Sequence, residues 1–244
     1  MHRNTVEFEV WGDYALFSDP ITRVGGEKFS YQIPTYEAIK GILHSIYWKP
    51  TFIWIIDQIR VMNPIQTETK GIRPIKLFND KNDLSYYTYL KDCRYQVQAH
   101  FIWNHNRPEL SDDRNEHKHH NIAKRMIKKG GRRDIFLGTR ECQAFVEPCV
   151  FGEDESYYDG MIGEVDYGFM YHGITYADEA ILEEDKEKMT VRFWKPVMKN
   201  GGIIEFIRPE DCTQKRHIRE MKLRIFGTDN FTGLNEFTSE EVGE

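Results

Sequence analysis

The chain has 244 residues, of which 40% are hydrophobic and 30% are charged, and its formal net charge is -6. It has no apolar run near the roughly 18 residues that a membrane-spanning helix needs, and its start, MHRNTVEFEV, has no apolar signal segment. We therefore expect a cytoplasmic protein without a membrane partner. The four cysteines form no CxxC pair, which argues against a zinc ribbon.

The first predicted elements are a strand, a helix and a second strand. Apolar residues alternate with glutamates in VEFEV, which indicates a half-buried strand over residues 6–10. In IPTYEAIKGILHSIYWKP the apolar residues change to helical spacing, with Thr35 placed to cap the start and Pro50 to mark the end. The apolar stretch TFIWIIDQIRVM then predicts a buried strand.

The next predicted elements are a strand, a helix and a final strand. Residues 64–83 hold two prolines and many polar groups, which predicts a loop. The stretch RYQVQAHFIW predicts a strand with Tyr95, Val97, Ala99 and Phe101 on one face. NIAKRMIKKGG has apolar residues at helical spacing and a double glycine that can end the helix in a left-handed cap, and CQAFVEPCVF predicts the last strand.

The order strand, helix, strand, strand, helix, strand is that of the ferredoxin-like βαββαβ arrangement, which RNA-recognition modules also use. We therefore predict an α+β fold with a ferredoxin-like N-terminal domain over residues 1–152. MTVRFWKPVMKNGGIIEFIRP predicts a hairpin, because NGG can supply positive φ between two apolar strands. Residues 153–228 are thus expected to form a small antiparallel β region, and residues 229–244 an acidic, mobile tail.

The segment from Arg114 to Arg140 departs from the overall charge. It holds nine Lys or Arg residues against Glu116 and Asp134, so it carries +7 while the rest of the chain carries -13. Phosphate attraction acts over a Debye length of roughly 8 to 10 Å, so a local patch is enough to bind a nucleic acid. Cations on a helix are usually a solvated face, but this run continues through KKGGRRD, where glycines let a backbone approach phosphate closely. The pattern favours an anionic polymer as the ligand.

Three histidines begin the same segment. His117 and His120 share a helix face while His119 points elsewhere, and no Cys or carboxylate is placed to complete a zinc site. At about 100° per residue, His119 falls in the middle of the helix's apolar arc and Lys118 at its border. His119 is therefore either a satisfied core histidine or an acid or base held at the rim of a basic surface, where its unperturbed pKa suits proton transfer near neutrality.

Two longer stretches resemble one known family. YQIPTYEAIKGILHSIYWKPTFIW and RNEHKHHNIAKRMIKKGGRRDIFLGTRECQAFVEP are similar to the type I-C (subtype d) branch of the fifth Cas protein family. Members of this branch are CRISPR-associated endoribonucleases that process precursor crRNA and stay in the Cascade complex. The resemblance covers most of the chain. It implies an RNA-recognition-like N-terminal domain, a small C-terminal β region, and RNA cleavage without a metal or other cofactor.

The resemblance also implies which residues carry the chemistry: Tyr47 in HSIYWKP, and Lys118 and His119 in EHKHHN. The 2′-hydroxyl of the RNA would attack, which gives a 2′,3′-cyclic phosphate and a 5′-hydroxyl. We assign charge stabilisation to Lys118, proton transfer to His119 and orientation of the nucleophile to Tyr47, because an unperturbed tyrosine pKa is about 10. Tyr47 can also be read as a core residue at a helix end. Seven further cations are expected to bind RNA: Lys124, Arg125, Lys128, Lys129, Arg132, Arg133 and Arg140.

Three functions stay open from the sequence. The first is an endoribonuclease that acts on the repeat hairpin of precursor crRNA and keeps the mature crRNA. The second is a non-catalytic subunit that binds the 5′ handle of crRNA. Both imply the backbone and large subunits of a type I-C Cascade as partners, with double-stranded DNA as a further candidate ligand. The third is a metalloprotein that uses the histidine cluster and binds no RNA.

Overall fold

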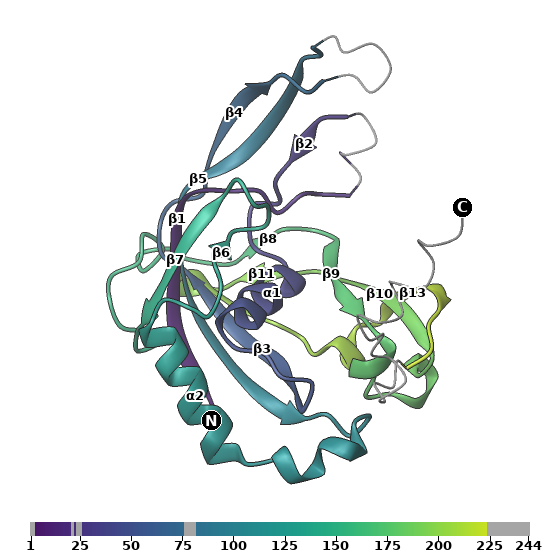
Figure 1. The fold of residues 1–244 in the computed structure, drawn as a ribbon. Coiled ribbons are helices and arrows are strands. Elements are labelled where there is room, and N and C mark those ends of the chain that lie inside the picture. Colours follow the sequence, from purple (N-terminus) through teal and green to yellow (C-terminus); the bar gives the residue numbers. More distant parts are fainter. Residues whose placement is uncertain (1–2, 21, 23–25, 76–81, 224–244) are drawn as a thin grey trace, which may run out of the picture.

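The computed structural model describes residues 3–20, 22, 26–75 and 82–223. Within them, eight strands form a main sheet in the order β12-β3-β5-β1-β7-β6, with β2 and β4 paired to further stretches of β5 (Figure 1). All pairs except β2–β5 are antiparallel. The strands are β1 (Val6–Ala15), β2 (Lys28–Phe29), β3 (Phe52–Val61), β4 (Gln66–Ile72), β5 (Ser85–Trp103), β6 (Ile135–Phe136), β7 (Gln143–Pro148) and β12 (Ile203–Glu205).

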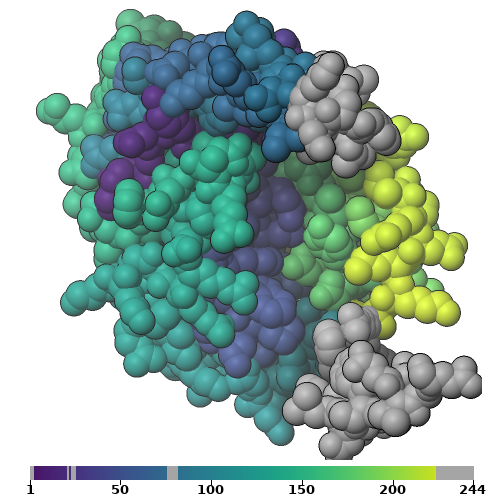
Figure 2. All heavy atoms as spheres, turned by 45° about the horizontal axis from the view of Figure 1, so that its top comes forward, coloured from purple at the N-terminus to yellow at the C-terminus, as the bar shows by residue number. Residues whose placement is uncertain are grey.

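Two helices connect the central strands. Helix α1 (Tyr36–Ile46) lies between β1 and β3 in the chain, and α2 (Glu116–Lys128) lies between β5 and β7. Helix α1 packs on β3 and β6, and α2 packs on β1 and β7 (Figure 1). Strand β5 lies between β1 and β3 and is antiparallel to both, so residues 6–10 and 94–103 are paired in one sheet. In Figure 2, α1 lies recessed between the teal surface of α2 and the green surface of the C-terminal strands.

Side-chain caps fix where α1 and α2 begin, and a pair of glycines fixes where α2 ends. The Thr35 side chain accepts a hydrogen bond from the Ala38 amide at 3.1 Å, which confirms the predicted N-cap of α1. The Asn115 side chain does the same for α2 from the Lys118 amide at 3.0 Å. Gly130 and Gly131 follow α2 with φ of 86° and 104°, which confirms the predicted left-handed stop.

The core lies between the sheet and these helices. Tyr95, Val97, Ala99 and Phe101 are all buried on one face of β5, as their alternation predicts. The buried apolar residues of α1 pack against the same face. This packing fixes the end of α1 and the start of α2 beside β3 and β5.

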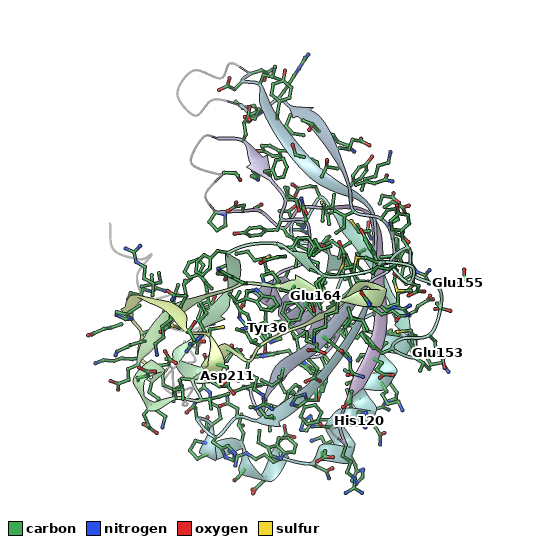
Figure 3. All side chains as sticks on the ribbon, turned by 180° about the vertical axis from the view of Figure 1, so that it is seen from behind. Tyr36, His120, Glu153, Glu155, Glu164 and Asp211 are labelled. Carbon is green, nitrogen blue, oxygen red and sulfur yellow. The ribbon has the colours of Figure 1, made fainter. Side chains whose placement is uncertain are left out.

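The opposite face of the main sheet is polar and is covered by the chain that follows β7. The Arg60 Nη1 atom donates to the carbonyl oxygens of Glu153 and Asp154 at 3.0 and 3.1 Å. The Gln96 side chain donates to the Glu153 carbonyl at 2.7 Å and accepts from the Gly152 amide at 2.9 Å. Figure 3 shows Glu153 and Glu155 on this part of the surface. We call residues 151–155 with the sheet face beneath them the outer face.

The C-terminal part forms a three-stranded antiparallel sheet beside α1, in the order β13-β10-β9 (Figure 1). Its strands are β9 (Met170–Thr175), β10 (Lys188–Trp194) and β13 (Gln214–Glu220), and a short pair joins β8 (Val165–Asp166) to β11 (Val197–Met198). The predicted domain boundary at residue 152 stays a prediction, since β12 pairs with β3 of the main sheet. The predicted tail, residues 229–244, lies outside the described residues. No helix of the described ranges is long and apolar enough to cross a membrane.

Two predicted connections are wrong. The predicted loop over residues 64–83 contains β4, which pairs along its whole length with the start of β5. Its side chains are polar on both faces, because this hairpin extends beyond the body of the molecule (Figure 1). The predicted hairpin around Asn200 is formed only at its turn, where Lys199 and Ile203 pair in an antiparallel bridge. The predicted pairing of its strands is wrong, because β10 pairs with β9 and β13, and β12 turns away to β3. Gly201 and Gly202 do adopt positive φ there.

Candidate active site

Tyr47 and His119 meet where α1 ends and α2 begins. The Tyr47 hydroxyl lies 2.8 Å from His119 Nδ1, although 72 residues separate them in the chain. Tyr47 is the residue that ends α1, and its extended backbone, with φ of -161°, turns the ring away from the helix axis. The Trp54 indole donates to the Tyr47 carbonyl at 2.8 Å, which holds this turn against β3.

The His119 ring has partners on both nitrogens. Its Nε2 atom lies 2.7 Å from the backbone carbonyl oxygen of Asp113. A carbonyl oxygen only accepts, so Nε2 carries a hydrogen, and Nδ1 of the neutral ring accepts from the Tyr47 hydroxyl. The ring is 0% exposed and is enclosed by Tyr47, Phe52, Phe101 and Trp103. Such an enclosure fixes the tautomer and the orientation of the imidazole.

Asp113 joins this pair to Lys118. It ends the short 3₁₀ helix η2 (Pro108–Asp113), and its carboxylate lies 2.5 Å from the Lys118 ammonium and 2.7 Å from the Thr51 hydroxyl. The same carboxylate lies 3.4 Å from His119 Nε2. The sequence-based reasoning missed Asp113 and Thr51. The sequence offers only one sign of them, an acidic pair, Asp112-Asp113, directly before the histidine cluster.

The charges at this site set the state of its groups. Burial raises the pKa of Tyr47, the Asp113 carboxylate raises it further, and the nearby Arg132 lowers it. The hydrogen bond from Lys118 lowers the pKa of Asp113, and the Thr51 hydroxyl and His119 act in the same direction. At neutral pH the site therefore holds a protonated phenol and an ionised carboxylate.

The loop after α2 brings cations to the same place. The backbone amides of Arg132 and Arg133 both donate to the Ser45 carbonyl oxygen, at 3.1 and 3.0 Å. That oxygen belongs to the last turn of α1, where helix carbonyls have no partner within the helix. The end of α1 thus anchors the Gly-Gly-Arg-Arg loop next to Tyr47.

The predicted RNA-binding cations lie on α2 and on the segments that follow it. Lys124, Arg125 and Lys128 lie on α2, Lys129 follows it, Arg132 and Arg133 lie in the anchored loop, and Arg140 lies in the turn between β6 and β7. All seven are exposed, and none of their side chains is paired with a carboxylate of the residues that the structure describes. Unpaired exposed cations attract phosphate without first losing another partner.

The three histidines do not converge on one point. His117 is exposed, His119 is enclosed in the aromatic cage, and His120 Nε2 bonds to the Thr5 carbonyl oxygen at 2.9 Å (Figure 3). In the part of the chain that the structure describes, no group of three or more His, Cys, Asp or Glu residues could hold a metal ion. The predicted division of the cluster, with His119 apart from its neighbours, agrees with this geometry.

Tyr47 and His119 are almost completely closed off from solvent. Tyr47 is 4% exposed and His119 0%, whereas the Lys118 side chain is 49% exposed. The burial and the satisfied nitrogens of His119 are what a structural histidine needs. The bond to a phenol and the adjacent ammonium are what proton transfer beside a phosphate needs. An approaching phosphate can reach Lys118 directly, and it can reach Tyr47 only after the surface above the ring opens.

The chain is similar to known proteins in sequence and in structure. The Cas5d family model, described as CRISPR-associated protein (Cas_Cas5), matches residues 5–205. A protein of Mannheimia succiniciproducens named CRISPR pre-crRNA endoribonuclease Cas5d is 30% identical over 169 residues, 60% of this chain and 68% of the relative. One of Thermus thermophilus with the same name is 32% identical over 152 residues, 59% of this chain and 63% of the relative. The chain therefore spans about two thirds of the length of these relatives. A crystal structure of a CRISPR-associated protein superposes with a TM-score of 0.72 at 37% identity, over 87% of this chain and 96% of the other.

Proposed function

Because the chain belongs to the Cas5d family of CRISPR-associated proteins, we propose that it is an endoribonuclease that cleaves precursor crRNA within the repeat and stays bound to the crRNA. Two relatives that match it along about 60% of its length are named for this activity. One observation carries the proposal for this chain. Tyr47 and His119, distant in sequence, are hydrogen-bonded next to Lys118 at the edge of a surface of unpaired cations.

The proposed mechanism uses the RNA's own nucleophile and no metal. The 2′-oxygen attacks the adjacent phosphorus, and the bond from phosphorus to the 5′-oxygen breaks, which leaves a 2′,3′-cyclic phosphate and a 5′-hydroxyl. The 2′-hydroxyl proton passes to the Tyr47 oxygen as the Tyr47 proton passes to His119 Nδ1, along the 2.8 Å bond. The 5′-oxygen takes a proton from water. His119 thus acts through Tyr47, since its own ring is enclosed.

Lys118 supplies the positive charge for the phosphorane in this proposal. Its ammonium is paired with Asp113 at 2.5 Å in the absence of RNA. A phosphate that replaces this carboxylate would keep the ammonium paired, and the released Asp113 carboxylate would keep its hydrogen bond from the Thr51 hydroxyl. We infer that Asp113 positions Lys118 before RNA arrives and then releases it.

The finer description of the fold is also a proposal. The strand order β7-β1-β5-β3 and the two helical connections support a ferredoxin-like domain over residues 1–152. The three-stranded sheet supports a separate β region after residue 152, although β12 returns to the main sheet. A fragment of residues 1–152 that unfolds because β3 has lost β12 would contradict the boundary.

We further propose that the protein works with the repeat hairpin of precursor crRNA, with mature crRNA, and with the backbone and large subunits of a type I-C Cascade. A non-catalytic crRNA-binding subunit is the second candidate function. It is favoured by one observation, the closure of Tyr47 and His119 from solvent. Double-stranded DNA would bind to the same cations, and a gel shift with a DNA duplex tests this.

The test is cleavage of a transcript that carries the CRISPR repeat of the source genome, with and without EDTA. The endoribonuclease cuts at one site in both conditions and leaves a cyclic phosphate, which phosphatase removes only after acid has opened the ring. A crRNA-binding subunit shifts the RNA in a gel without cutting it. A metalloprotein outside RNA metabolism does neither. Cutting that stops in EDTA and returns with a divalent cation would overturn the metal-free mechanism.

A further inference from the structure

A groove of about 530 Å³ lies on the side of α2 that packs against β1 and β7. Its apolar wall is formed mainly by Pro148 and Cys149 at the end of β7, because Val6 on β1 and Ile127 on α2 also line it but are each only 2% exposed. It does not include Tyr47, His119 or Lys118, and the mechanism above makes no use of it. Its volume falls within the range of about 300 to 1,000 Å³ that is typical of small-ligand pockets.

Cations form the other wall of the groove. Lys124, Arg125 and Lys128 line it from α2, and all three are exposed. One acid, Glu7, also lines it, but both of its carboxylate oxygens are engaged. Oε1 accepts from the Gln98 side chain at 2.7 Å, and Oε2 accepts from the Phe151 amide at 3.3 Å. The groove therefore combines exposed cations with an apolar wall.

The end of the groove is fixed by His120. Its Nε2 atom donates to the Thr5 carbonyl oxygen at 2.9 Å, which ties the chain before β1 to α2. The neighbouring residue His119 faces the Tyr47 site, about 100° away around the helix, so two consecutive histidines serve different sides of α2. At Cys149, burial raises the pKa of the thiol to about 12, so this wall stays uncharged at neutral pH.

We propose that this groove binds one or two unpaired nucleotides of the RNA, with phosphates on the α2 cations and bases against the apolar wall. The proposal rests on the proposed function. A double helix would present only phosphates to the cations, whereas an unstacked base has an apolar face that Pro148 and Cys149 can cover. The groove would thus hold a single-stranded part of the RNA away from the cleaved bond.

The experiment separates bases from phosphates. An eight-nucleotide oligouridylate is compared with an abasic ribose-phosphate chain of the same length and charge, by fluorescence anisotropy. The wild type should bind the oligouridylate about tenfold more tightly, because burying a base face removes apolar surface from water. Cys149→Trp, which fills the groove without changing charge, should lose most of that preference. Val150→Trp is the matched control, because Val150 is 53% exposed and does not line the groove.

Each outcome decides the proposal. A Cys149→Trp protein with the wild-type melting temperature and the wild-type base preference overturns it. Equal loss in Val150→Trp also overturns it, because the effect is then not specific to the groove. If Cys149→Trp does not fold, the base preference is measured instead in Cys149→Leu, which has a smaller side chain. Oligouridylate binding is measured apart from repeat cleavage, so a chain that binds but does not cut refutes the proposed function alone. A chain that cuts but shows no base preference refutes the groove alone.

Discussion

The two faces of the main sheet differ in both charge and cover. On the helix face, α2, the loop after it and the turn between β6 and β7 present seven exposed cations with no carboxylate partner among the described residues. On the outer face, Glu7 and Glu9 are held by Gln98 and Arg94, and the acidic segment of residues 151–155 lies over them. The helix face can therefore attract a polyanion, and the outer face repels one.

This difference bears on how the proposed RNA-recognition-like fold would bind RNA. RNA-recognition modules stack bases on aromatic residues of the open sheet face. In this chain, backbone amides and carbonyls of residues 151–154 occupy much of that face through bonds to Arg60, Gln96 and Glu7. A shared strand order thus does not fix the binding face. The charges and the covering segment place the RNA on the helix side in our proposal.

The largest expected effect is that of His119→Ala on the helix face. We expect cleavage to fall by about 10² to 10⁴, since this is what a proton-transfer group contributes, while repeat-RNA binding is largely kept. Rates under single-turnover conditions and affinity for a non-cleavable 2′-deoxy substrate measure the two separately. If the variant cuts at the wild-type rate, or is unfolded in a thermal melt, His119 is a structural core histidine.

Tyr47→Phe comes next, because it removes the hydroxyl and keeps the ring that packs on Phe52. We expect a loss of about 10² in rate with a folded protein, since the variant breaks the 2.8 Å bond to His119. Burial raises the pKa of Tyr47 above its ordinary value, so the hydroxyl stays protonated near neutrality. A wild-type cleavage rate for Tyr47→Phe would mean that Tyr47 is only a core residue at a helix end.

Asp113→Asn tests the positioning role by a split between binding and rate. The variant keeps the shape but removes the charge that holds Lys118, so we expect cleavage to slow about tenfold. RNA affinity should rise slightly, because phosphate no longer competes with a carboxylate for the ammonium. Equal falls in rate and affinity would instead indicate a general loss of structure.

Asp113→Asn should also change how the stability of the protein depends on pH. The pKa of Asp113 is lowered in the folded protein, so its contribution is present above the ordinary Asp pKa and is lost as pH falls through the lowered value. The melting temperature of the wild type should therefore decline more steeply below about pH 4 than that of Asp113→Asn. At pH 7 the variant should melt about 2 to 4 °C lower, as for a loss of about 1 kcal/mol. Parallel pH curves would contradict the ion pair.

The sequence predicted those parts of this site that local patterns determine. Thr35 caps α1, the double glycine ends α2, and the helical spacing of α2 places His119 on its packed face. These features are predictable because capping and helical spacing act within a few residues. Asp113 was missed because nothing local shows that η2 folds back onto the start of α2. Its contact with Thr51 joins residues 62 apart.

Strand pairing was harder to predict for the same physical reason. The polar stretch of β4 has no apolar face to indicate a strand, and only the length of β5 gives it a partner. Strand β12 has an apolar pattern, but that pattern is equally suited to β10 and to β3. Partner choice depends on long-range packing, which alternation along one strand does not encode.

A smaller effect is expected from the loop beside the site. Replacing Arg132 and Arg133 together by Ala should reduce the slope of log affinity against log salt by about 1.4, since each single-strand phosphate contact contributes about 0.7. Backbone amides, not side chains, bond the loop to Ser45, so the loop should keep its place. An unchanged slope would mean that these two arginines are only a solvated surface. Lys186→Ala with Lys215→Ala is a control of equal charge away from α2.

The smallest effect is expected on the outer face, and it gives the sharpest test of the comparison. Phe145 on β7 is 54% exposed there and lies near Trp11, with ring centroids 6.0 Å apart, so it is the obvious platform for stacking a base on this side. Glu147, two residues along β7 from Phe145, is exposed on the same face, and its carboxylate opposes an incoming phosphate. We therefore expect Phe145→Ala to change repeat-RNA affinity by less than about twofold, where a base stacked on it would make the loss about 1 to 3 kcal/mol. A loss above tenfold, in a protein that melts normally, would place RNA on the outer face and reverse the assignment of the two sides.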